Sequence, residues 1–339
     1  MYDDGDWKGN IAFNGQTLRM TEQSAWYPLI YDKSKDVLIS KYTYSIHVVC
    51  EDGTSIYVNG DIPKAGNKNL FSSATPVALM LFAGTYSFKQ EKGIYFINTS
   101  LSPNEASLLS TWSNDIISFY SERLHIPYGS RIFYLSATPV SKNNVWLFET
   151  YPTIAMIGRQ MTMHDLFTKT TLLAIDTSNI AFIAHEIGHY YFGTLMTPNS
   201  ELQWAFLEGF TEYLSLQYIK EKLGDSLYNQ KIRKYIDAVY EAKDITPINK
   251  VTNTYQSTEV FKYRYVPLLL VALEKKIGQE KMWKWLQNVL QTKSATTNYV
   301  FFKNSLLNAG VDAQTFQSFE YLYINSDKAL KNITELVSR

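Results

Sequence analysis

The chain of 339 residues is poor in cysteine and histidine and carries no net charge. Its single cysteine, Cys50, excludes an intrachain disulfide and a zinc cluster built from cysteines. Thirty-two basic residues balance thirty-two acidic ones, and no basic run forms a phosphate-binding surface. The composition therefore predicts no nucleic-acid partner.

Long hydrophobic runs are also missing. The most apolar stretches, PVALMLFAG and VPLLLVAL, are shorter than ten residues, whereas a membrane-spanning helix needs about twenty. We therefore expect no transmembrane segment in this chain. The first residues, MYDDGDWKGN, are acidic and polar and do not resemble a signal peptide. A cytoplasmic and an extracytoplasmic location both stay open, as does the possibility that the chain is a piece of a larger protein.

The first hundred residues have the pattern of β-strands. The stretch DVLISKYTYSIHVVC alternates polar and apolar residues, and TSIYVNG, TPVALMLFAG, TYSFKQ and GIYFINT follow between Gly, Asn, Asp and Lys clusters. The chain is 45% hydrophobic and 15% aromatic, which is enough for a large core. We predict a β-rich N-terminal domain over residues 1–100.

A helical pattern begins just after residue 100. Ser102, Pro103 and Glu105 have the spacing of a capping box with proline at the first helical position. Two further strands are expected in RIFYLSAT and NNVWLFET. Helices are expected over residues 179–193, 200–222, 225–242, 258–276 and 279–291. The predicted fold class is α+β, with a mostly helical second domain over residues 101–339.

Two of the five histidines lie in the short run HEIGH. His185 and His189 are four residues apart and share one face of a helix, so both imidazoles can reach one ion. Glu186 lies about 100° around the helix from His185, beside such an ion, where a general base for water is needed. Imidazole ligands of this kind suit zinc. The alternative is a buried helix whose histidines bond to carbonyl groups.

A catalytic zinc needs a third protein ligand. Glu208 follows His189 by nineteen residues within LEGFTEY, and Gly193 and Pro198 allow the second helix to fold back on the first. Glu212, one turn further on, is a candidate to accept a hydrogen bond from a ligand histidine. The alternatives are a solvated Glu208 and a surface charge at Glu212.

HEIGHYYFG followed by LEGFTEY resembles the paired zinc motifs of the aminopeptidase N family of gluzincins. AWYPLIYD, FYSERLHIPYGSRIFYLSATP and VDAQTFQSFEYLYI extend the resemblance over most of the chain. It implies an N-terminal β domain, a thermolysin-like catalytic domain and one Zn²⁺ per chain. It also implies zinc ligation by His185, His189 and Glu208, with a peptide or protein as substrate.

The same resemblance implies a tyrosine that stabilises the oxyanion. In FKYRYVPLLLVALEKKIG the matching position is Tyr263, and Tyr265 is the near alternative. The family's Gly-Ala-Met-Glu-Asn motif, which binds the substrate amine, has its best match in TIAMIGRQMTMHD. There Ala155 and Met156 match, but Ile157 and Gly158 replace Glu and Asn. Compared with full family members, we also expect the β domain to be truncated at its start and the further C-terminal domains to be absent.

These features predict a zinc-dependent peptidase in which Glu186 takes the proton of the attacking water. The activity is aminopeptidase-like, and the choice between exopeptidase and endopeptidase stays open. A non-catalytic peptide- or protein-binding protein with a structural zinc is the rival interpretation. Hydrolysis of a non-peptide substrate is another.

Overall fold

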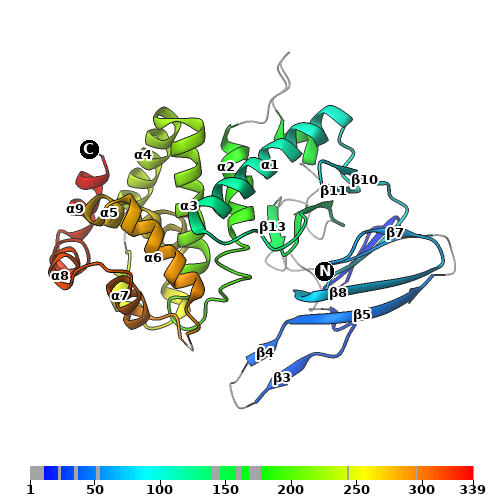
Figure 1. Ribbon diagram of the computed structural model, residues 1–339, viewed down its shortest axis with the longest axis horizontal. Helices are drawn as coiled ribbons and strands as arrows, with labels where there is room; N and C mark the ends of the chain where they lie inside the picture. Colours follow the sequence, from blue (N-terminus) through cyan, green and yellow to red (C-terminus); the bar gives the residue numbers. More distant parts are fainter. Residues whose placement is uncertain are drawn as a thin grey trace. The chain divides into compact units, whose positions relative to one another are not determined.

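The computed structural model describes residues 11–21, 24–33, 37–50, 54–138, 146–157, 162–167, 177–242, 244–294 and 296–338. The chain forms two compact units, one made of Met1–Asn114 with Gly129–Asn179 and the other of Asp115–Tyr128 with Ile180–Arg339. Strands dominate the first part of the chain and helices the second (Figure 1), so the expected α+β class is confirmed. The division of the sequence near residue 100 stays a prediction.

The first unit contains a five-stranded antiparallel sheet and two separate strand pairs. The sheet has the order β1 (Ile11–Phe13), β2 (Thr17–Met20), β9 (Leu81–Gly84), β6 (Ser55–Val58) and β7 (Lys64–Ala65). The pairs are β3 (Ile30–Asp32) with β4 (Val37–Ile39), and β5 (Lys41–Val49) with β8 (Lys68–Ala78). The β pattern of the first hundred residues therefore predicted real strands.

A second, mixed sheet completes the first unit. Its order is β10 (Phe88–Glu91), β11 (Ile94–Ile97), β12 (Phe133–Ser136), β14 (Thr153–Ile157) and β13 (Trp146–Thr150), with β12 parallel to both of its neighbours. The strands expected in RIFYLSAT and NNVWLFET are confirmed as β12 and β13. A short 3₁₀ turn, η2 (Met163–Leu166), follows β14.

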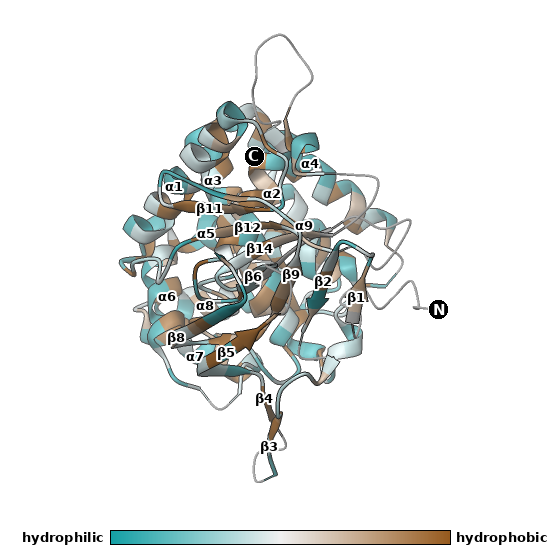
Figure 2. Cartoon of the chain, turned by 90° about the vertical axis from the view of Figure 1, so that its right-hand side faces the viewer, coloured by the Kyte–Doolittle hydropathy of each residue, from teal (hydrophilic) through white to brown (hydrophobic). Residues whose placement is uncertain are grey.

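Successive side chains of β6 point into two different buried clusters of the first unit. Tyr57 packs in a buried cluster with Phe133 and Ala155 of the mixed sheet, whereas its neighbours Ile56 and Val58 pack with a cluster beside β8. Figure 2 shows the apolar character of β11, β12 and β14, which supply much of the first cluster.

The helix expected after residue 100 is α1 (Pro103–Leu124). The capping box is confirmed, because the Ser102 backbone N–H donates to Glu105 Oε2 at 2.8 Å and the Glu105 N–H donates to Ser102 Oγ at 3.3 Å. The last turns of α1 belong to the second unit. There the Tyr120 hydroxyl donates to the Ala184 carbonyl at 2.9 Å and ties α1 to the helix that carries HEIGH.

The second unit is helical. Its longer elements are α2 (Thr177–Gly188), α3 (Phe210–Tyr218), α4 (Asp225–Glu241), α5 (Val266–Ile277), α6 (Gln279–Gln291), α7 (Tyr299–Asn308), α8 (Ala313–Glu320) and α9 (Ala329–Val337). Every residue of α3 is buried, as is all of α5 up to Glu274, which is typical of central helices. Shorter 3₁₀ turns are η5 (Ile248–Lys250) and η6 (Thr254–Gln256). Within the described residues, the structure has no helix of the length and apolarity that a membrane crossing needs.

In the part of the chain that the structure describes, four π-helical turns interrupt or extend these helices: η3 (Ala205–Gly209), η4 (Ile219–Leu223), η7 (Phe261–Tyr265) and η8 (Tyr321–Asn325). The sequence predicted plain helices at the first three. The expected helix over 179–193 is also wrong at its end, because α2 stops at Gly188. Tyr190, Tyr191 and Phe192 stay buried beyond that point, so the apolar pattern continues after the helix has ended.

Candidate metal centre

The two histidines of HEIGH lie together at the end of α2. His185 is in the last turn of the helix, and His189 is in the tighter turn that follows, where its N–H donates to the Glu186 carbonyl at 3.3 Å. Both side chains are buried, and their rings meet at 90° with centroids 4.7 Å apart. The expected shared face is therefore present, although His189 lies just outside the α-helix.

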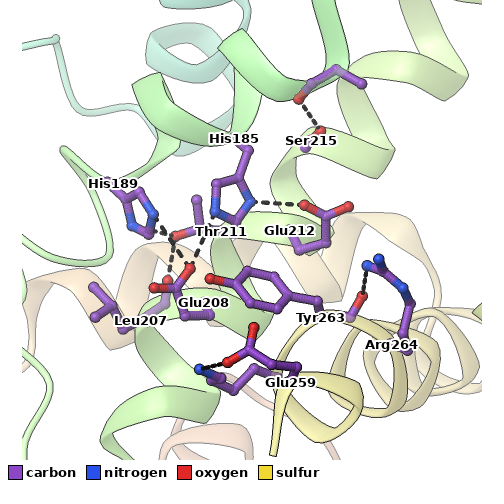
Figure 3. Close-up of polar contacts among 12 residues, drawn as sticks. His185, His189, Leu207, Glu208, Thr211, Glu212, Ser215, Glu259, Tyr263 and Arg264 are labelled. Atoms are coloured by element: carbon purple, nitrogen blue, oxygen red, sulfur yellow. Dashed lines mark hydrogen bonds and ion pairs between the residues drawn. The ribbon is translucent and has the colours of Figure 1, made fainter. Parts of the chain in front are cut away.

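Glu208 brings a carboxylate to both imidazoles from the π turn η3. Its Oε2 lies 3.2 Å from Nε2 of His185 and 3.4 Å from Nε2 of His189 (Figure 3). One donor atom from each of the three side chains lies within 4.8 Å of the other two. The structure therefore gathers the three residues that the sequence singled out as ligands.

The spacing of these atoms fits zinc. Tetrahedral zinc has bonds of about 2.0–2.1 Å to nitrogen and oxygen, and the edge of such a tetrahedron is about 3.3 Å. The two nitrogen-to-oxygen distances, 3.2 and 3.4 Å, match that edge. Two neutral imidazoles and one carboxylate are also the donor types that a catalytic zinc takes, with a fourth position left for water or substrate.

The outer nitrogen of each imidazole has a partner on α3. Nδ1 of His185 donates to Glu212 Oε2 at 2.7 Å, as the sequence suggested for Glu212. Nδ1 of His189 lies 3.4 Å from the Thr211 hydroxyl. With Nδ1 protonated, each ring presents the lone pair of Nε2 to the centre of the cluster.

Thr211 was not predicted. Glu208, Thr211 and Glu212 stand at positions i, i+3 and i+4, which share a helix face. That spacing was the signal that could have found Thr211 beside the second histidine. Gly188 also bears on this contact, because an added Cβ there would lie 2.9 Å from the Thr211 methyl group. The missing side chain lets α2 and α3 approach closely.

Buried carboxylates give this cluster an affinity for positive charge. Burial alone would raise the pKa of Glu208 and Glu212, but His189 beside Glu208 and Lys231 beside Glu212 lower both values, that of Glu212 to about 2. In return, although burial opposes it, the hydrogen bonds that His185 donates to Glu208 and Glu212 raise its pKa to about 10. The field in the cluster therefore favours a cation at the shared position.

Glu186 is buried on α2 next to the ligand histidines. Burial raises the pKa of its carboxyl to about 7, and the charges of His189 and His185 act in the opposite direction. A carboxyl with a pKa near neutrality can both accept and return a proton. Its environment is therefore that of a buried carboxyl that can exchange a proton near neutral pH, rather than of a solvated surface group.

Of the two tyrosines considered, the structure brings Tyr263 to the cluster. Its ring centroid lies 5.8 Å from that of His185, and Figure 3 shows its hydroxyl directed toward Glu208. Burial and the charge of Glu208 raise its pKa, so the hydroxyl is protonated at neutral pH. Tyr265 is buried and packs on Phe261 in the same π turn.

The stretch matched to the amine-binding motif lies in the first unit. Ala155 and Met156 are buried on β14, and Ile157 ends that strand. Residues 158–161 of this stretch, Gly158 among them, lie outside the described residues.

Known proteins resemble the chain in both sequence pattern and fold. A family model described as the Peptidase family M1 domain matches residues 112–323. The match includes His185, His189 and Glu208, which we call the donor cluster. No curated protein sequence matches the chain.

Solved structures share its fold at low sequence identity. Native yeast LTA4 hydrolase matches with a TM-score of 0.62 and 15% identity, over 92% of this chain and 49% of that one. An M1 zinc metallopeptidase from Deinococcus radiodurans matches with a TM-score of 0.57 and 16% identity, over 83% and 63%. Native leukotriene A4 hydrolase from Saccharomyces cerevisiae gives 0.60 and 17%, over 84% and 46%. The chain thus spans less than two thirds of each of these proteins.

Proposed function

Because the chain belongs to peptidase family M1, we propose that it is a zinc-dependent peptidase. His185, His189 and Glu208 hold one Zn²⁺, and peptides or proteins are the substrates. The observation that carries the proposal is a buried set of three donors in which both imidazole-to-carboxylate distances are near the edge of a zinc tetrahedron. Beside it lies the buried carboxyl of Glu186, on the helix that carries His185.

Each side chain has a distinct task in this proposal. Bound zinc supplies Lewis acidity, which polarises the scissile carbonyl and lowers the pKa of water toward 7. Glu186 accepts the proton of the attacking water and returns it to the leaving amine. The Tyr263 hydroxyl donates a hydrogen bond to the oxyanion of the tetrahedral intermediate. Glu212 and Thr211 orient the two imidazoles.

Substitution of Glu186 tests the role that this proposal assigns to it. In Glu186→Gln the amide keeps the shape of the side chain but cannot take up a proton, so we expect kcat to fall by about 10²–10⁴-fold while zinc stays bound. The matched control is Glu241→Gln, which changes an exposed glutamate at the end of α4 and should leave kcat unchanged. Full hydrolysis by Glu186→Gln would refute the mechanism.

Ile157 and Gly158 bear on which kind of peptide is cleaved. Isoleucine has an uncharged side chain and glycine has none, so neither residue can bind an α-amino group by charge. This favours weak selectivity for free N-termini. A pool of free and N-acetylated peptides, with products identified by mass spectrometry, separates the alternatives. Stepwise loss of N-terminal residues from free peptides alone indicates an aminopeptidase, and internal cuts or equal cutting of blocked peptides indicate an endopeptidase. Zinc binding without any cleavage would favour a non-catalytic peptide-binding protein.

A further inference from the structure

The carboxylate behind His185 is itself held in place by α4. Glu212 uses Oε2 to accept from His185 Nδ1, and its other oxygen, Oε1, accepts from the Tyr235 hydroxyl and from Lys231 Nζ at 3.4 Å. Lys231 and Tyr235 are four residues apart and so share one face of α4. Tyr235 is 3% exposed, and its hydroxyl is therefore removed from competing water.

The ring of Tyr235 makes a second contact that leads to Tyr263. The Arg264 guanidinium lies 4.6 Å from the centroid of the Tyr235 ring. The same guanidinium donates from Nη1 to the backbone carbonyl of Tyr263 at 2.8 Å, a bond that Figure 3 shows beside the cluster. The hydroxyl of Tyr235 thus supports a ligand histidine, and its ring supports the π turn that carries the candidate oxyanion donor.

We infer that Tyr235 is a positioning residue for both halves of the metal centre. Its hydroxyl fixes Glu212 and, through it, the orientation of His185, while its ring fixes Arg264 and, through it, the backbone at Tyr263. The inference rests on the proposed function, because it takes zinc as the ion and Tyr263 as the oxyanion donor. No sequence pattern pointed to this role, since Tyr235 lies in an ordinary amphipathic helix 27 residues beyond Glu208.

The physical reason is that a carboxylate anchored at both oxygens cannot rotate. With Oε1 held by α4, Oε2 stays aligned with His185 Nδ1, and the Nε2 lone pair stays aimed at the metal. Loss of an outer hydrogen-bond partner of this kind commonly weakens metal binding by about 10–100-fold. Tyr235 acts one contact further out than Glu212, so we expect its effect at the lower end, about tenfold.

Zinc affinity, measured by competition with a chromogenic chelator, tests the hydroxyl without requiring any peptide cleavage. Tyr235→Phe removes the hydroxyl and keeps the ring, so zinc binding should weaken about tenfold. Tyr240→Phe is the matched control, because this tyrosine is on the same helix but its hydroxyl bonds to Thr334 Oγ1 at 2.7 Å. That control should bind zinc like the wild type.

A double variant separates positioning from a general structural role. If Tyr235 acts through Glu212, adding Tyr235→Phe to Glu212→Gln should weaken zinc binding no further than Glu212→Gln alone. Additive losses, or wild-type affinity in Tyr235→Phe, would overturn the inference. A wild type that binds no zinc would instead refute the proposed function.

Arg264→Lys tests the ring contact. Lysine keeps the charge but loses the flat guanidinium that stacks on the ring and donates to the Tyr263 carbonyl. We expect a lower kcat with unchanged KM and unchanged zinc affinity, whereas Tyr235→Phe, which keeps the ring, should change the zinc affinity. A wild-type kcat in Arg264→Lys would remove this half of the inference.

Discussion

The hydroxyl of Tyr263 faces the donor cluster as a hydrogen-bond donor. Burial and the nearby carboxylate of Glu208 disfavour its ionised form and raise its pKa. A donor that is already in place costs little reorganisation when negative charge develops on the substrate oxygen. The role proposed for Tyr263 therefore differs from that proposed for Glu186, which has to exchange a proton.

Tyr263→Phe should lower kcat by about 10²–10³-fold, the usual effect of removing one oxyanion donor. The ring remains, so KM and zinc affinity should change little. Steady-state kinetics and a chelator titration measure these quantities. The matched variant is Tyr265→Phe in the same π turn, which should keep kcat near the wild-type value. Equal losses in both variants would show that Tyr263 has no special part in the reaction.

At the scale of elements, the third candidate zinc ligand and the proposed oxyanion donor both lie in π turns. Glu208 is in η3 and Tyr263 is in η7, and such turns are rare and frequent at functional sites. Gly209 lies where the two turns meet. A Cβ at Gly209 would lie 2.3 Å from Val266 Cγ1, so only glycine allows this approach.

Gly209→Ala should therefore push η7 away from η3. The backbone of Gly209 is ordinary right-handed helix, with φ −67° and ψ −40°, so the cost comes from crowding rather than from backbone strain. We expect a loss of about 1–3 kcal/mol in the free energy of unfolding, together with a lower kcat as Tyr263 moves. Denaturant unfolding and kinetics measure the two effects.

A second substitution checks the steric explanation. Val266→Ala removes the closest contact, Cγ1 at 2.3 Å, but keeps Val266 Cβ at 2.7 Å. The double variant should therefore recover part of the activity that Gly209→Ala loses. If Gly209→Ala were as stable and as active as the wild type, the close approach of the two turns would not be needed for stability or activity.

The sequence could predict what depends on spacing along one segment. The capping box at Ser102, the shared face of His185 and His189, and the position of Glu208 after a turn all follow from distances of a few residues or one helical hairpin. The π turns could not be predicted, because they keep the same apolar pattern as a plain helix. Tyr235 and Arg264 could not be predicted either, because their roles arise only when α4 packs against η7.

At the scale of the whole molecule, the candidate metal site lies within the second unit. His185, His189, Glu208, Glu212 and Tyr263 all belong to it, and the family match covers all five. The family match and the donor spacing therefore support the same proposal.

The most direct test is to locate the metal. Crystals of the zinc-loaded protein, measured at wavelengths on both sides of the zinc absorption edge, show where zinc scatters anomalously. The account predicts one strong peak per chain, at bonding distance from Nε2 of His185, Nε2 of His189 and the carboxylate of Glu208. A zinc-loaded crystal with no peak there, or with its peak at other residues, would contradict the account.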